Sequence, residues 1–210
     1  MIFIRYENWR KYVKYYPVTT LLVLANVLMF VILSLNGGSR DFDTLYHYGA
    51  VSNLQPEGEY WRFFAAMFLH HGFDHLLFNC FAIFVFAPPL ERLMGWWRFA
   101  ILYLASGFIA NLLDHAYQQH MLDPYTNWIG VGASGAIYSV YGAFLYIALL
   151  QRQLMDEGSR RTLYALLFVG VIFSFIQENV GWFAHLGGLF CGFFIYGLII
   201  RWFKPPLLRT

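Results

Sequence analysis

Long uncharged stretches alternate with short charged segments along the whole chain. The uncharged windows cover residues 15–39, 75–90, 99–113, 124–151, 162–177 and 179–200. A helix needs about 20 mainly apolar residues to cross a bilayer, within a range of about 17–25. The second, third and fifth windows are slightly short, and they fit if those helices tilt or the bilayer thins locally. The pattern predicts one all-α domain over residues 1–210, a polytopic bundle of six transmembrane helices. The expected spans are roughly 17–35, 73–90, 97–114, 134–151, 162–177 and 184–202.

The placement of Lys and Arg predicts the orientation of these spans. If the N-terminus is cytosolic, only Arg40 and Arg62 of the 14 basic residues fall in outer segments. Cytosolic loops of membrane proteins carry an excess of Lys and Arg. We therefore expect a multi-pass protein of the plasma membrane with both termini in the cytosol. The first apolar run lacks a convincing cleavage site, so it is expected to be a retained span.

The longest loop, residues 36–71, differs from a plain connector. It mixes aromatic and aliphatic side chains, such as Trp61, Phe63 and Met67, with charged ones. We expect part of this first outer loop to lie in or against the outer leaflet.

Composition excludes most other classes of protein. Hydrophobic residues make up 59% of the chain and charged residues only 12%, against about 25% charged in an average soluble domain. A net charge of +2, without Lys/Arg-rich loops, argues against a nucleic-acid partner. Cys80 and Cys191 both lie in apolar runs without CxxC spacing, which favours buried free thiols.

Three of the predicted spans carry polar residues that a passive membrane helix would avoid. His75 and Asn79 lie four residues apart in the second span, Ser134 heads the fourth, and His185 lies near the start of the sixth. Counted back from the next cytosolic charge at about 1.5 Å per residue, all four lie about 18–27 Å above it. They therefore share one layer in the outer half of the membrane. Ionisable groups are costly to bury there, which indicates a functional site.

Stripes of small residues indicate how the fourth and sixth spans pack. Small residues at intervals of four allow helix backbones to approach closely in membranes. If these faces meet, His185 can reach the Ser134 hydroxyl, which needs a base to act as a nucleophile. No acidic residue lies at the same depth in these spans, so a Ser–His dyad is favoured over a triad, and Tyr138 is positioned to hold the His185 ring. The two stripes are Gly135, Ser139 and Ala143, and Ala184, Gly188 and Gly192.

A tetrahedral intermediate would also need hydrogen-bond donors. Asn79 and His75 can supply them from the second span, and the Ser134 N–H from the head of the fourth. Gly130 and Gly132 would let an unwound segment enter the membrane, which is tolerable only where the backbone lines protein or a wet cavity.

Simpler interpretations apply to several of these residues taken singly. GASG alone is more often a helix-packing motif than a catalytic one, and it is not the GxSxG elbow of soluble hydrolases. His70, His71 and His75 lack a carboxylate partner and an HExxH motif, so we expect no metal and no cofactor. The remaining histidines are expected to be solvated loop residues: His47, His115 and His120.

In combination and in this order, the motifs resemble the rhomboid family of intramembrane serine proteases. The resemblance runs from about residue 61 to residue 192, and the expected member is a bacterial one with only the six-helix core and no soluble appendage. The matching segments are the pair Trp61–Arg62, HLLFN with His75 and Asn79, the pair Glu91–Arg92, GASGxxY with Ser134 and Tyr138, and AHLGGxxxG with His185, Gly188 and Gly192.

The resemblance implies roles for these residues. Ser134 would be the nucleophile and His185 the general base, and His75, Asn79 and the Ser134 amide would form the oxyanion hole. Trp61–Arg62 and Glu91–Arg92 would be scaffold contacts, with Gly132, Gly135, Gly188 and Gly192 in helix packing.

It further implies cleavage of transmembrane segments of membrane-protein substrates, within or near the outer leaflet, by a site open to the outer face. Two other classes stay open. A non-catalytic relative would bind or retain client helices without cleaving them. A transporter or channel would want polar groups on both sides of the midplane.

Overall fold

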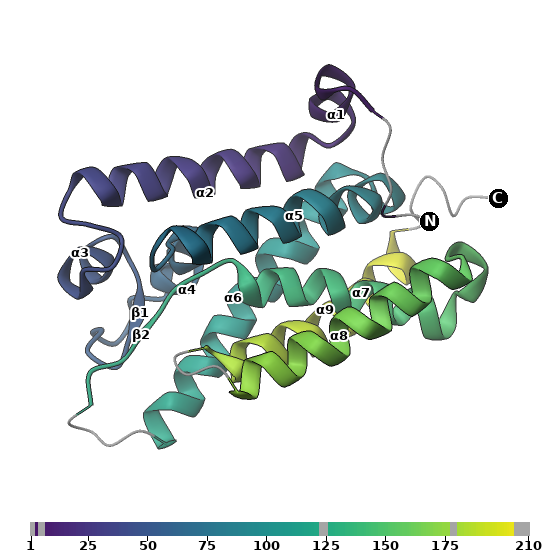
Figure 1. Ribbon diagram of the computed structural model, residues 1–210. Helices are drawn as coiled ribbons and strands as arrows, with labels where there is room; N and C mark the ends of the chain where they lie inside the picture. The colour runs from purple at the N-terminus through teal and green to yellow at the C-terminus, as the bar shows by residue number, and fades with distance from the viewer. Residues whose placement is uncertain (1–2, 4–6, 122–125, 177–179, 204–210) are drawn as a thin grey trace.

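The structure, a computed structural model, describes residues 3, 7–121, 126–176 and 180–203. Its described part holds nine α-helices, two 3₁₀ turns and one pair of two-residue strands (Figure 1). The predicted all-α class is therefore confirmed. The helices are α1 Trp9–Tyr15, α2 Pro17–Leu35, α3 Phe42–His47, α4 Trp61–Ala65, α5 Phe73–Met94, α6 Trp96–Met121, α7 Ser134–Leu150, α8 Glu157–Ile176 and α9 Trp182–Trp202; η1 is Ala66–Phe68, η2 Arg152–Leu154, β1 Val51–Ser52 and β2 Ile129–Gly130.

Five helices are long and apolar enough to cross a membrane, namely α2, α5, α6, α8 and α9, and α7 is a shorter apolar helix of 17 residues. These six correspond to the six predicted spans, so the polytopic fold is confirmed as well. The boundaries differ most for α6, which continues to Met121 instead of ending near residue 114. The last residue of the fifth expected span, 177, lies outside the described residues.

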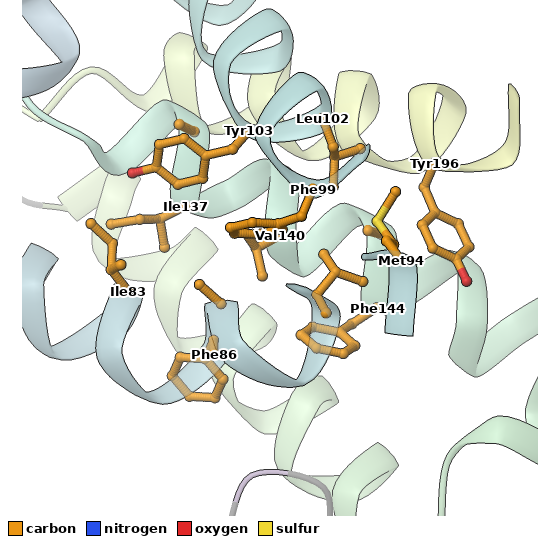
Figure 2. Close-up of a cluster of buried hydrophobic side chains, with 14 of the residues drawn as sticks. Ile83, Phe86, Met94, Phe99, Leu102, Tyr103, Ile137, Val140, Phe144 and Tyr196 are labelled. Atoms are coloured by element: carbon orange, nitrogen blue, oxygen red, sulfur yellow. The ribbon is translucent and has the colours of Figure 1, made fainter. Parts of the chain in front are cut away.

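α7 has the largest share of buried residues among the six apolar helices. It packs against α5, α6 and α9. Figure 2 shows the core that they share, in which aromatic and aliphatic side chains from all four helices interdigitate. By contrast, α2 and α8 are mostly exposed and lined with large apolar side chains. Such faces are stable against lipid rather than water.

The packing of α7 against α9 brings the two backbones into direct contact. A Cβ atom on Gly188 would overlap the carbonyl oxygen of Gly135, and one on Gly192 would overlap that of Ser139. A Cβ on Gly142 would likewise overlap the carbonyl of Leu189. The small-residue stripes therefore do face each other, and only glycine allows this separation.

The long first loop is folded rather than irregular. Arg62 is 5% exposed, donates to the carbonyls of Tyr46 and Ala50, and pairs with Glu59. Its guanidinium also lies over the rings of Tyr46 and Trp61, 4.2 and 4.9 Å from their centroids. One arginine thus ties together α3, β1 and α4, as expected of a scaffold contact.

The opposite end of the bundle is held by Glu91, a buried carboxylate on α5. Its two oxygens accept from the backbone N–H groups of Val18 and Thr19 at 2.9 Å, and from the Thr19 hydroxyl at 2.7 Å. These N–H groups belong to the first turn of α2, which has no intrahelical partner for them. Arg92 approaches Glu7 at 4.0 Å, so the pair joins the N-terminal segment and α2 to α5.

The expectation for three histidines was partly wrong. His115 is buried within α6 and lies against the rings of Phe63 and Trp128, because α6 extends two turns beyond the predicted span. His120 lies in the last turn of the same helix and His47 in the last turn of α3; both are exposed.

Candidate active site

Ser134 is the first residue of α7, which places its side chain and amide at the head of the helix. The first-turn N–H groups of a helix have no intrahelical acceptor and favour negative charge. The segment before it is fixed from the first loop, since the Gly132 N–H donates to the Ala66 carbonyl at 2.9 Å. Gly132 has a φ of +122°, a conformation that glycine adopts without strain.

His75 and Asn79 on α5 lie against this segment. A Cβ on Gly132 would be 2.7 Å from His75 Nε2 and 3.8 Å from Asn79 Nδ2. The Asn79 amide also donates to the His75 carbonyl at 3.0 Å, an i to i−4 contact that fixes its orientation. Two side-chain donors from α5 are therefore packed against the backbone two residues before Ser134.

His185 is buried on α9, where its ring stacks on that of Tyr138. The ring centroids are 4.2 Å apart and the planes differ by 7°. Tyr138 lies one turn after Ser134 on α7, so the stacking holds the imidazole against the first turns of this helix. The imidazoles of His185 and His75 are also close enough to interact electrostatically. The structure thus brings together the four polar groups that the sequence placed in one membrane layer.

Ser174 is a site residue that the sequence reasoning missed. It lies on α8, 3% exposed, and its Oγ is 2.6 Å from His185 Nδ1. Tyr138 Oη lies 3.1 Å from the same oxygen. The available signal was weak: a lone serine near the outer end of an otherwise apolar span, with no motif around it.

Asp114 is a second residue near the site that the sequence reasoning missed. It is 4% exposed on α6 and accepts from the backbone N–H of Ala184 and from Gln118. Ala184 is the third residue of α9, whose own N-cap, Gly181, provides no side-chain acceptor. A carboxylate on a neighbouring helix thus satisfies the N–H that a capping side chain would normally take. It supports the helix turn that carries His185.

His70 lies behind the site in the first loop and is fully buried. Burial, together with neighbouring His75, lowers its pKa to about 3, so it is neutral at physiological pH. Among the described residues no three His, Cys, Asp or Glu side chains cluster as metal ligands would. The absence of a metal or cofactor stays a prediction.

These observations define a class: a polytopic membrane protein with a buried polar site, in which a helix-head serine, a stacked histidine and two α5 donors converge. The Rhomboid domain family model matches residues 57–202. The chain is 37% identical to "Putative rhomboid protease YdcA" of Bacillus subtilis over 95% of its length and 97% of that protein. It is 35% identical to Rhomboid protease GluP of Bacillus subtilis over 84% of this chain and 33% of that protein. With Rhomboid protease AarA of Providencia stuartii the identity is 27%, over 83% of this chain and 69% of that protein.

The chain belongs to the rhomboid family. The predicted resemblance, including its bacterial relatives, is therefore confirmed, and the family supports protease activity for this multi-pass membrane protein.

Proposed function

We propose that the chain is an intramembrane serine endopeptidase that cleaves transmembrane segments of membrane proteins through a Ser134–His185 dyad. The observation that carries the proposal is that His75 and Asn79 lie against the backbone two residues before Ser134, while the His185 ring stacks on Tyr138, one turn after Ser134. A serine or histidine that served only helix packing would not need side-chain donors from a third helix beside it.

In the proposed mechanism His185 takes the Ser134 proton while Oγ attacks the scissile carbonyl. The proton then passes to the leaving amine, and an acyl-enzyme forms at Ser134. A water molecule, deprotonated by the same imidazole, releases the acyl group. The base needs to be neutral at the start, and burial of the imidazole favours this state because a buried charge is costly.

The carbonyl oxygen becomes an anion during both steps and needs donors that are already oriented. We assign this role to the Asn79 amide, His75 and the Ser134 N–H. Their placement supports the assignment, because His75 and Asn79 lie close to Gly132, two residues before the Ser134 N–H. Oriented donors in a water-poor site stabilise such an anion more strongly than they would in water.

The expected setting is the plasma membrane, with both termini cytosolic and the site in the outer half of the bilayer, open to the outer face. The polar residues lie at the heads of α5, α7 and α9, at one end of the bundle. Substrates would be single transmembrane helices that unwind near this end and present an extended peptide bond to Ser134.

The proposal is tested with purified wild type and Ser134→Ala in proteoliposomes that contain single-span substrates. A fluorophosphonate should label the wild type on Ser134 alone, and labelling should fade in acid as His185 protonates. Ser134→Ala should abolish both labelling and cleavage while the protein stays folded. His185→Ala should abolish or nearly abolish both.

Wild-type cleavage by Ser134→Ala, with contaminating proteases excluded, would overturn the proposal. Binding of the substrate helices without cleavage by the wild type would instead favour a relative that retains client helices.

A further inference from the structure

The hydroxyl of Ser174 is surrounded by three polar atoms on three helices. Its Oγ lies 2.7 Å from the Gly170 carbonyl oxygen on its own helix, 2.6 Å from His185 Nδ1 on α9 and 3.1 Å from Tyr138 Oη on α7. The serine is nearly inaccessible to solvent. Each of these contacts is within hydrogen-bond distance, and we treat each as a hydrogen bond with one proton between its two atoms.

The protons can be assigned by counting. A serine hydroxyl has one proton to donate and two lone pairs to accept with. The Gly170 carbonyl has no proton, so the Ser174 proton goes to it, a common i to i−4 bond of helical serine. The other two contacts then require Ser174 Oγ to accept, from the Tyr138 hydroxyl and from an N–H at His185 Nδ1. Any other assignment leaves the two oxygens of Ser174 and Gly170 facing each other without a proton.

This count determines the tautomer of the catalytic base. A neutral imidazole carries its proton on one nitrogen only. With the proton on Nδ1, the lone pair is on Nε2, which is the state that a general base needs. A carboxylate performs this orienting role in a Ser–His–Asp triad, whereas here the buried carboxylate of Asp114 is bonded to the Ala184 backbone.

We propose that Ser174 is a positioning residue that holds His185 in the Nδ1–H tautomer, so that Nε2 is free to take the Ser134 proton. The inference rests on the proposed function. Tyr138 contributes twice, by stacking on the ring and by donating its hydroxyl to Ser174. The Nδ1–H bond persists when His185 becomes an imidazolium, since that nitrogen keeps its proton throughout the cycle.

The first test measures the tautomer directly, without substrate. Nitrogen-15 NMR of histidine-labelled protein, with the His185 signals assigned by the His185→Gln variant, should show a single Nδ1–H tautomer in the wild type. Ser174→Ala should show a mixture containing the Nε2–H form, because the acceptor at Nδ1 is gone. Ser106→Ala is the matched control: this α6 serine is also fully buried, but its hydroxyl has no partner among the described residues, and the His185 signals should not change.

The second test measures turnover. Ser174→Ala should lower kcat and the rate of fluorophosphonate labelling by about tenfold, the loss expected for one ordinary hydrogen bond. KM should be unchanged, because Ser174 has no contact with substrate. Ser174→Thr keeps the hydroxyl and should recover most of the rate. If Ser174→Ala does not fold, Ser174→Cys replaces it as the variant that weakens the bond to Nδ1, because a thiol is a weaker acceptor of similar size.

The positioning role would be overturned if His185 kept a single Nδ1–H tautomer in Ser174→Ala, or if the labelling rate of that variant were unchanged. So would equal losses in Ser174→Ala and in a folded Ser174→Thr. These outcomes are separable from failure of the proposed function, which would appear as cleavage by Ser134→Ala while the tautomer measurement stays unaffected.

Discussion

At the scale of one residue, Asn79 is a buried amide that has a donor hydrogen left over after its bond within the bundle. Its amide is 6% exposed, so it needs partners, and the structure gives it one, the His75 carbonyl at 3.0 Å. One Nδ2 hydrogen satisfies this bond, which leaves the second available for another acceptor. In the proposed mechanism that acceptor is the oxyanion.

Replacing Asn79 by Ala tests this role. We expect turnover to fall about 10²–10³-fold, the loss measured when one oriented oxyanion donor is removed elsewhere. His75→Ala should have a milder effect, because the Ser134 backbone amide shares its role. Cleavage kinetics in proteoliposomes, with far-UV circular dichroism to check the fold, provide the measurement. Unchanged turnover in Asn79→Ala would mean that this face of α5 serves only packing.

The contact between α7 and α9 is the element-scale feature that sets the relative position of the two residues of the proposed dyad. Ser134 and His185 lie on different helices, and their relative position depends on how closely the two backbones approach. Gly135 and Gly188 allow that approach at the level of the dyad. Because backbone atoms cannot move aside as a flexible side chain can, added volume here must separate the helices.

Two adjacent glycines of α9 provide a matched comparison. Gly188→Ala places a methyl group on the Gly135 carbonyl, whereas the nearest atom to a Cβ on Gly187 is Leu113 Cδ1 at 3.3 Å, the end of a flexible side chain. Both changes gain about 1 kcal/mol of helix propensity. We expect Gly188→Ala to lose about 1–3 kcal/mol through overpacking and to reduce cleavage, while Gly187→Ala keeps near wild-type stability and activity.

The comparison is made by thermal unfolding in detergent and by cleavage rate. If the two substitutions had equal effects, the close α7–α9 contact could not be the cause of the loss of stability and cleavage.

At the scale of the whole molecule, charge asymmetry predicts how the bundle sits in the membrane. In a variant lacking Cys80 and Cys191, single cysteines introduced near Arg5 or near Thr210 should react with a membrane-impermeant thiol reagent only from the cytosolic side. Cysteines near Ser52 and Gln119 should react only from outside. The physical reason is the excess of Lys and Arg in the predicted cytosolic segments. Labelling of either terminus from outside would contradict this orientation and place the site in the other leaflet.

Hydropathy and motif spacing were sufficient to predict the class of fold and the family, and they supplied the candidate site residues. Transmembrane helices need long apolar runs, and polar groups within such runs are costly, so both features are visible along the chain. The stripes beside Ser134 and His185 even indicated which helix faces meet. Hydropathy and the spacing of small residues are local properties of the chain, so they can be read without knowledge of the fold.

The tertiary structure alone decided what surrounds each buried polar group. Ser174 on α8 meets His185 Nδ1, and Asp114 on α6 meets the Ala184 N–H, although neither pair is close in sequence or marked by a motif. Burial forces every polar atom to find a partner, but which partner it finds depends on the rotation and register of helices packed together. The sequence therefore predicted that a serine and a histidine share one layer, and packing determined which groups surround the histidine.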